Sequence, residues 1–338
     1  MKALRYAIPF LFLALVPLGT LLGGIWTFLP IAALPVILAG FDGLFGVESP
    51  GTINADRIAY RLTPWLYIPL QIAVTGWAAV IIVHLSILES IGLTLSVGLT
   101  AGIFGMLAAH EMVHSRSPVE RALGLTFLAG VGYMQFRIAH IHGHHWRAAT
   151  PQDSATARRG ESAYRFVLRS AFGQTREAWQ FEAERLRRRG KAIFSSSNRM
   201  LGYFFIEALV LFAVSFLGWK AFAFFAAQSV LAIVLLEFFN YIAHYGLMRR
   251  PLPSGELEPL AARHSWNSSR RMNNWTLLNM GRHSDHHRVT TRHYQCLEPL
   301  PDSPELPFGY AGAILTALLP PLWRRVMDPK VDAWMAPR

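Results

Sequence analysis

Cysteine is almost absent from this sequence, and charged residues are scarce. The single cysteine, Cys296, cannot form an intramolecular disulfide, and one thiolate cannot hold an iron–sulfur cluster. Only 16% of the 338 residues are charged, whereas 52% are hydrophobic, which is more apolar side chain than a soluble core of this length requires. The composition therefore indicates a membrane protein, and any electrons that it uses must come from another molecule.

Acidic residues are outnumbered by basic ones, 21 against 32, so the formal net charge is +11. The arginines lie in gaps between apolar runs and do not form a basic face interleaved with aromatic residues. The positive-inside rule explains this distribution, and we expect no nucleic-acid partner.

Six apolar stretches approach the roughly 20 residues of a membrane crossing. They cover residues 6–22, 24–40, 65–84, 91–109, 201–217 and 219–242. The first follows Lys2 and Arg5 as a signal peptide would, but no small-residue cleavage site precedes the next apolar run, so we expect a retained helix. The prediction is an all-α integral membrane protein with about six transmembrane helices, in which residues 1–338 form a single domain.

The long segment between the fourth and fifth stretches sets the orientation. Residues 147–199 contain twelve Lys or Arg, whereas the short joining segments near Gly23, Glu89 and Gly218 carry at most one. By the positive-inside rule, the long segment is predicted to be cytoplasmic. With six spans and a cytoplasmic N-terminus, the histidine-rich segments share the cytoplasmic face of what we expect to be a bacterial inner membrane. Residues 121–136 and 308–319 are too short for a comfortable crossing and are predicted to be re-entrant or interfacial.

A charged helix is predicted between residues 162 and 189, and it ends in Arg185, Arg187, Arg188 and Arg189. Its basic end is explained by solvation on the cytoplasmic side. The alternative is a docking surface for an acidic electron-transfer partner.

Histidines are the feature that the sequence has in abundance. Ten of the 13 fall into short motifs that follow the apolar stretches: HEMVH, HIHGHH, NYIAHYG and HSDHH. Nine of the ten fit the spacing of these motifs, and His142 is left out because it is displaced from the HxxxHH frame. Spacings of three and four residues project imidazoles from one face of a helix, and nine imidazoles exceed what one metal ion binds. The motifs therefore predict two metal ions held by His110, His114, His140, His144, His145, His244, His283, His286 and His287.

HEMVH by itself also fits the zinc-protease motif HExxH, in which Glu111 would act as general base on a metal-bound water. That interpretation leaves the histidines outside the motif unexplained. In the two-metal interpretation Glu111, Asp285 and Asp153 are candidate carboxylates that orient an imidazole, with ordinary interfacial charge as the alternative.

Two glutamates fall inside apolar stretches, where a carboxylate is costly to bury, so both are candidates for function. Glu237 is favoured over Glu207, because Glu237, Asn240 and His244 follow one another at i, i+3 and i+7 on one helical stripe.

With these motifs in view, the chain resembles the integral-membrane alkane 1-monooxygenases, the alkane hydroxylase branch of the fatty acid desaturase superfamily. The resemblance covers nearly the whole chain and includes GHHWRAATPQDSATARRGES, NYIAHYGLMRR, HSWNS and RHSDHHRVTTRHYQCL, with HYG as its most specific element. It implies a six-helix membrane fold and a non-haem di-iron centre bound by the same nine histidines. It also implies hydroxylation of the terminal carbon of an alkane or alkyl chain with O2, with electrons from rubredoxin and an NAD(P)H-dependent rubredoxin reductase.

The chain departs from the branch at two positions: the family usually has a glutamate where this sequence has Ala139 and Ala243. After HSWNS, Ser269 and Arg270 stand where a histidine is common. The remaining alternatives are benzylic hydroxylation of an alkyl-aromatic such as xylene, fatty acid desaturation or lipid hydroxylation, and, from a different class, the zinc membrane protease.

Overall fold

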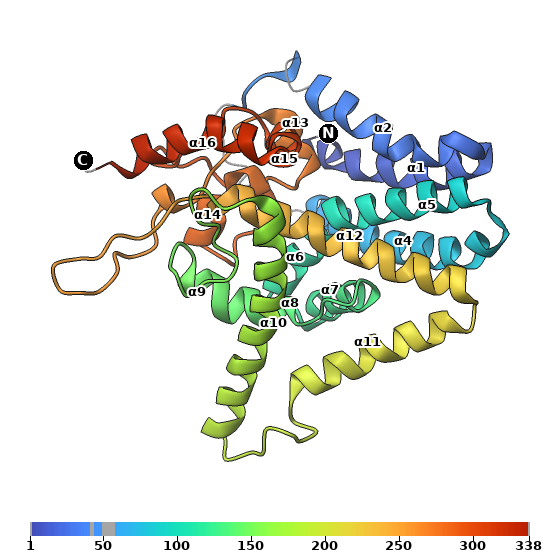
Figure 1. Cartoon of the computed structure of the whole chain (residues 1–338), viewed down its shortest axis with the longest axis horizontal. Helices are drawn as coiled ribbons and strands as arrows, with labels where there is room; N and C mark the ends of the chain where they lie inside the picture. The colour runs from blue at the N-terminus through green and yellow to red at the C-terminus, as the bar shows by residue number, and fades with distance from the viewer. Residues whose placement is uncertain (1, 41–43, 49–57, 337–338) are drawn as a thin grey trace.

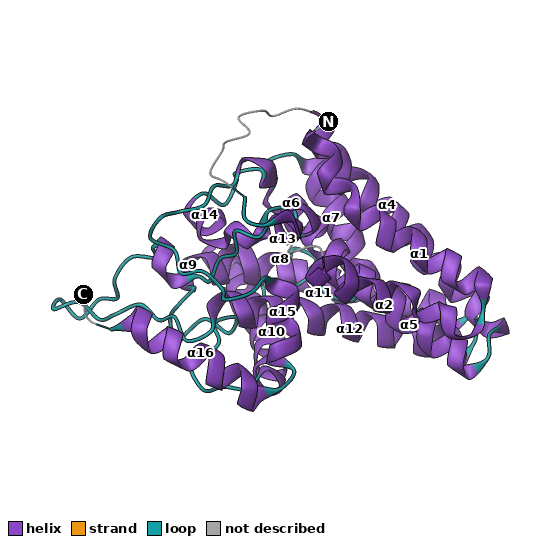
Figure 2. Ribbon diagram, turned by 90° about the horizontal axis from the view of Figure 1, so that it is seen from above, coloured by secondary structure: helices purple, strands orange, loops and turns teal. Residues whose placement is uncertain are grey.

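The computed structural model describes residues 2–40, 44–48 and 58–336. In these residues the chain is helical, and the only extended pairings are isolated bridges such as Pro251 with Leu257. Figure 2 shows the helices joined by loops, which gather on the side of α9 and α14 and away from α1 and α5. The expected all-α architecture is confirmed for this part of the chain.

Four helical segments among the described residues are long and apolar enough to cross a membrane. They are Ala3–Leu22, Ile58–His84, Ile87–His114 and Trp219–His244. They contain α1 (Ile8–Leu22), α4 (Ile58–Ile81), α5 (Ile87–Thr100) with α6 (Met106–His114), and α12 (Trp219–His244). The protein is therefore an integral membrane protein.

The other two predicted spans are shorter helices. Residues 24–40 give a shorter apolar helix, Gly24–Pro35, which includes α2 (Leu29–Pro35). The stretch 201–217 gives α11 (Arg199–Ser215), 17 residues long. The structure thus has four full-length candidates, and the count of six stays a prediction.

The long helices lie side by side and bring their ends together. In Figure 1, α5 runs along α12, with α1 and α4 beside them, whereas α10 (Ala163–Arg188) projects away from this bundle. The short α7 (Pro118–Gly130) packs on α6 and has 13 residues, fewer than a crossing requires. The remaining labelled helices are α8 (Phe136–Ala139), α9 (His145–Arg147), α13 (Arg271–Thr276), α14 (His283–Arg288), α15 (Tyr310–Ala317) and α16 (Pro320–Met335).

Two π-helical turns lie next to the histidine motifs. The first, Ala101–Gly105, joins α5 to α6, and the second, His140–His144, joins α8 to α9. A π turn inserts an extra residue into the helical repeat, so it rotates the side chains that follow it relative to those before it. In the first turn, a Cβ on Gly102 would lie 2.9 Å from Cα of Ala232, so glycine allows this turn to pack closely on α12.

Candidate metal centre

Four separate helical segments deliver the nine predicted histidines to one region of the molecule. The last turn of α6 carries His110 and His114, and α12 ends at His244. The second π turn and α9 carry His140, His144 and His145, and α14 carries His283, His286 and His287. The short helix α14 lies at the ends of the spans in Figure 1, so its imidazoles meet those of the longer helices.

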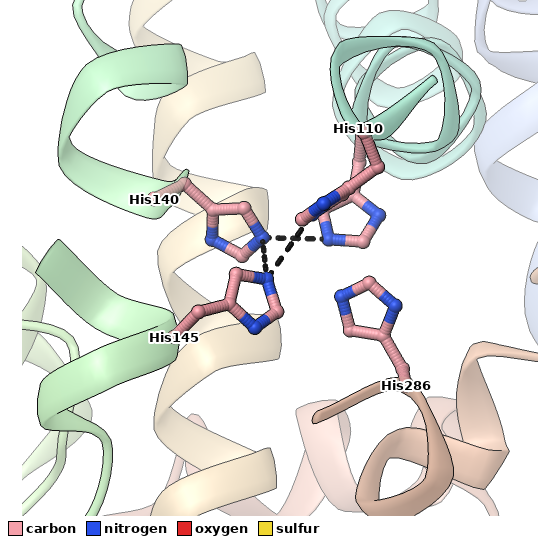
Figure 3. Close-up of side chains that lie close together, drawn as sticks. His110, His140, His145 and His286 are labelled. Atoms are coloured by element: carbon pink, nitrogen blue, oxygen red, sulfur yellow. Dashed lines mark hydrogen bonds between the residues drawn. The ribbon is translucent and has the colours of Figure 1, made fainter. Parts of the chain in front are cut away.

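Five of the imidazoles form one group, whose candidate ligand atoms all lie within 4.8 Å of one another. The group consists of His110, His114, His140, His145 and His286. Nε2 of His140 lies 2.8 Å from Nε2 of His110 and 2.9 Å from Nε2 of His145, which is also 3.1 Å from Nε2 of His114. Figure 3 shows His110, His140, His145 and His286 arranged around a common centre, with His286 rising from α14.

The other four imidazoles form a second group, whose candidate ligand atoms also all lie within 4.8 Å of one another. It consists of His144, His244, His283 and His287. Nε2 of His283 lies 3.0 Å from Nε2 of His244 and 3.1 Å from Nε2 of His287. The groups are adjacent, because the ring centroids of His145 and His287 are 4.8 Å apart.

The spacing of these nitrogens fits ligands of a metal ion. Two imidazole nitrogens bound to one ion at about 2.0–2.1 Å, as in zinc sites, lie about 2.9–3.4 Å apart in octahedral or tetrahedral geometry. Facing nitrogens in imidazoles that lack a metal can share only one proton at each contact. Buried ring nitrogens without a hydrogen-bond partner include Nε2 of His144 and Nε2 of His286. The donor set therefore fits a metal in each group.

The imidazoles outside the spans are held in the neutral form that a metal ligand requires. Burial, reinforced by neighbouring imidazoles, lowers the pKa of each of these side chains well below its usual range. They are His140, His145, His283, His286 and His287.

Two of the imidazoles are oriented through their second ring nitrogen. Nδ1 of His144 lies 2.9 Å from Oδ2 of Asp153, and both side chains are buried. Nδ1 of His244 lies 3.3 Å from the backbone oxygen of His264. Contacts of this kind fix the ring and direct Nε2 toward a metal. The role of the His264 carbonyl was not predicted, because a backbone acceptor leaves no trace in residue identity.

Two other candidate carboxylates contact residues outside the nine. Oε1 of Glu111 accepts hydrogen bonds from Nδ1 of His293 at 3.2 Å and from the backbone N–H of Tyr294 at 3.3 Å. Asp285 pairs with Arg288 at 2.7 Å and Arg292 at 2.6 Å. Both carboxylates thus anchor the chain segment that follows α14.

Glu237 is fully buried and lies in a polar cluster between helices. It accepts hydrogen bonds from Gln174 at 2.7 Å, Tyr133 at 3.1 Å and Asn240 at 3.3 Å. The cluster joins α10 and α12 to the segment after α7, so Glu237 reaches the histidines through helix packing and has no direct contact with them among these bonds. Glu207 instead accepts a bond from the backbone N–H of Met134 at 2.6 Å.

Ala139 and Ala243, the two departures from the family pattern, are both buried beside candidate ligands. Ala139 precedes His140. The backbone oxygen of Ala243 accepts a hydrogen bond from the backbone N–H of Trp266 at 2.8 Å. A glutamate at either position would need polar partners that differ from the alanine methyl's present neighbours.

Comparisons with known proteins agree with this geometry. A model of the fatty acid desaturase family matches residues 86–312. Alkane 1-monooxygenase 2 of Pseudomonas aeruginosa is 38% identical over 92% of this chain and 85% of its own length. Alkane 1-monooxygenase 1 of the same organism is 40% identical over 92% and 84%.

A more distant relative is the hydroxylase component of the xylene/toluene monooxygenase of Pseudomonas putida, which is 29% identical over 99% of this chain and 90% of its own length. The higher identities to the alkane enzymes favour that branch. The nine-histidine region lies within the matched family segment. The chain therefore belongs to the fatty acid desaturase family, and within it to the integral-membrane alkane 1-monooxygenases.

Proposed function

We propose that this protein hydroxylates the terminal carbon of an alkane or alkyl chain, using O2 and electrons from rubredoxin. The observation that carries the proposal is an apolar cavity of about 330 Å³ that ends beside the histidine groups. Its lining is contributed mainly by α2, α5, α6, α12 and α15 and by the first π turn. An unfunctionalised hydrocarbon has no polar group to bind, so an apolar cavity is the kind of site that it requires.

The cavity is lined by residues that neighbour the candidate ligands, although none of the nine histidines is part of its lining. Leu107 lines the cavity one helical turn before His110 on α6. Phe239 also lines it, and its ring centroid lies 5.7 Å from that of His283. The Phe239 ring stacks on Tyr310 at 4.5 Å, and the Tyr310 hydroxyl donates to the backbone oxygen of Trp266 at 3.1 Å. The end of a bound chain would therefore meet fixed aromatic walls next to the imidazoles.

The cavity volume suits a medium-length chain. An apolar cavity of about 150 Å³ holds one benzene, with six carbon atoms. By the same measure, 330 Å³ holds about thirteen carbons. The outer lining includes Leu315 and Leu318, which are 52% and 42% exposed, so a longer chain can extend out of the cavity.

Two iron ions, one in each histidine group, form the proposed non-haem di-iron centre, and when bound they supply the chemistry that reduces dioxygen. The balanced reaction converts R–CH3, O2, two electrons and two protons into R–CH2OH and H2O. The chain itself contributes neutral nitrogen ligands, a carboxylate that orients His144, and an apolar wall that keeps water from the carbon end of the site.

Electrons must be delivered by a partner, because the only cysteine is Cys296. The proposed donor is rubredoxin, reduced by an NAD(P)H-dependent reductase. The proposed location is a bacterial inner membrane, surrounded by lipid and with the histidine face toward the cytoplasm, which is supported by the basic residues of segment 147–199.

The test combines metal analysis with product analysis. We expect about two iron atoms per purified chain and substrate-dependent oxygen uptake with octane, rubredoxin, its reductase and NADH, giving 1-octanol. His283→Ala should lower both iron content and oxygen uptake. If the enzyme forms a benzylic alcohol from xylene but no octanol, or an alkene from a fatty acid, the alkane is not its substrate. One zinc per chain without oxygen uptake would refute the proposal.

A further inference from the structure

An exposed tryptophan lies directly beside the metal centre. Trp146 is 76% exposed and belongs to the short helix α9, between His145 and Arg147. Many other exposed hydrophobic side chains lie on the spans, such as Trp219 on α12, where lipid covers them. In Figure 1, α9 lies beside α14 and away from α1, α2 and α5. The membrane therefore does not explain the exposure of Trp146.

Trp146 follows a member of each histidine group along the backbone. The preceding residue, His145, belongs to the five-histidine group, and His144 belongs to the four-histidine group. Adjacent Cα atoms are about 3.8 Å apart, so the exposed indole is one residue from one group and two residues from the other. An electron that enters at this ring has a short path to either group.

Two arginines adjoin Trp146, one as the next residue in the chain and one through a contact with its backbone. The Arg147 guanidinium lies 4.7 Å above the ring of Phe181 on α10. Arg249 donates a side-chain hydrogen bond to the backbone oxygen of Trp146 at 3.0 Å, and its backbone N–H donates to Ala149 at 2.8 Å. Both cations are thus held by contacts with the protein. Tryptophan and arginine together are typical of the residues that dominate protein interfaces.

We propose that Trp146, Arg147 and Arg249, which we call the Trp146 surface, form the docking site for the electron donor. This inference rests on the proposed function. The partner that fits is a small acidic protein with a one-electron iron centre near its surface, because its carboxylates would pair with the arginines and its apolar edge would cover the indole. In each of two dockings per turnover, the ferrous donor becomes ferric and gives one electron to this chain.

The basic end of α10 is the competing surface, and the structure favours it less. Arg185 pairs with Glu182 at 2.6 Å, and Arg188 pairs with Glu184 at 2.8 Å, so part of its charge is neutralised within the helix. In Figure 1, α10 extends away from α9 and α14 toward that end. A donor docked there would lie farther from the histidine groups.

The test measures the dissociation constant for oxidised rubredoxin with purified, iron-loaded protein in detergent. We expect Trp146→Ala to weaken binding by about 30-fold, the loss typical of an interface hot spot, and Trp146→Phe to restore most of it. Arg147→Gln with Arg249→Gln should weaken binding and reduce its dependence on salt. Iron content should be unchanged, and KM for rubredoxin should rise more than kcat falls.

Trp219→Ala is the matched control, because Trp219 is 77% exposed at the opposite end of α12, and its affinity should equal that of the wild type. Unchanged affinity in Trp146→Ala, or a loss confined to Arg188→Glu with Arg189→Glu, would overturn the Trp146 surface while leaving hydroxylation intact. If the wild type hydroxylates octane but binds no rubredoxin, the proposed donor is wrong and the Trp146 surface is not a rubredoxin-docking site.

Discussion

At the scale of single residues, Asp153 determines how one candidate ligand is presented. Its Oδ2 lies 2.9 Å from Nδ1 of His144 and accepts a hydrogen bond from the Thr156 hydroxyl at 2.6 Å. Burial alone would raise the pKa of the Asp153 carboxyl, but the His144 imidazole and the Thr156 hydroxyl lower it. Asp153 is therefore an ionised acceptor that holds the His144 ring with Nε2 toward the four-histidine group.

Replacing Asp153 by Asn should weaken metal binding while keeping the shape of the side chain. Loss of a carboxylate behind a metal-binding imidazole typically reduces affinity about 10–100-fold. The measurement is iron retention against a competing chelator, with Asp332→Asn as the control, because Asp332 forms an exposed pair with Arg159. Equal retention in both variants would show that Asp153 does not orient a ligand.

We expect Phe239 to limit how far a chain can enter the site, since its ring lines the apolar cavity and its centroid lies 5.7 Å from that of His283. Phe239→Leu should let the chain end move past its present limit and raise the share of 2-octanol over 1-octanol. Gas chromatography of the alcohols measures this ratio. Phe225→Leu on the same helix is the control, because Phe225 lines a different apolar cavity, and an unchanged ratio in Phe239→Leu would count against the assignment.

The nine histidines could be selected from the sequence because helical spacing and apolar runs place them at helix ends. Partners distant in sequence could not be selected in that way. Glu111, one residue after His110, bonds to His293, 182 residues later, whereas Asp285 bonds to Arg288 and Arg292, which lie outside the HSDHH motif. Whether a carboxylate meets a ligand or a neighbouring arginine depends on tertiary packing, which spacing alone does not specify.

At the scale of helices, α10 and α11 are joined through one buried carboxylate. Glu182 bonds to Arg185 at 2.6 Å and to Arg199 at 2.8 Å. Burial alone would raise the pKa of Glu182, but the hydrogen bonds from these two arginines lower it to about 2. The ionised side chain therefore fixes the end of one helix to the beginning of the next.

This linkage predicts how stability depends on pH. The pKa in the folded protein lies below the ordinary value of 4.5, so the stabilisation is complete above pH 4.5 and is lost as pH falls toward 2. The difference in thermal midpoint between wild type and Glu182→Gln should narrow below pH 4.5. Glu184→Gln, which removes an exposed pair, should change the midpoint little, and a pH-independent difference for Glu182→Gln would contradict this assignment.

The length of an apolar stretch predicted that a helix forms there, but it did not predict whether that helix is one regular α-helix. Residues 24–40 were expected to form one span, and they are helical, but the helix changes from 3₁₀ (Gly24–Phe28) to α (Leu29–Pro35) to π (Val36–Gly40), and Pro30 and Pro35 lack backbone donors. The result is a short α2 that lines the substrate cavity. The π turn at His140–His144 was also not predicted, because its geometry depends on packing around the imidazoles.

At the scale of the whole molecule, His84 and the metal centre lie at opposite ends of the bundle. His84 ends the segment Ile58–His84, and the next segment, Ile87–His114, returns over 28 residues to the ligands. A helix of that length spans about 42 Å, enough to cross the hydrocarbon core. One end of the bundle therefore carries the histidines and the other carries His84.

This arrangement predicts opposite labelling of two introduced cysteines. In a Cys296→Ser background, a membrane-impermeant thiol reagent should label His84→Cys in intact spheroplasts and Arg188→Cys only in inverted vesicles. The positions are suitable because both are exposed. Labelling of both from the same side would contradict the proposed orientation, and oxygen uptake by each variant checks that it is folded.

Because the outer end of the cavity is open, an observed preference for one chain length can arise from partitioning into lipid as well as from binding in the cavity. Leu315 and Leu318 line that end and are exposed, so we expect the substrate to enter from hydrocarbon dissolved in the bilayer. Each added methylene favours transfer out of water by about 0.8 kcal/mol, or about fourfold. An apparent KM expressed per volume of water will thus fall about fourfold per carbon through partitioning alone. The selectivity of the cavity itself is the difference in KM between chain lengths that remains when substrate concentration is expressed as mole fraction in lipid.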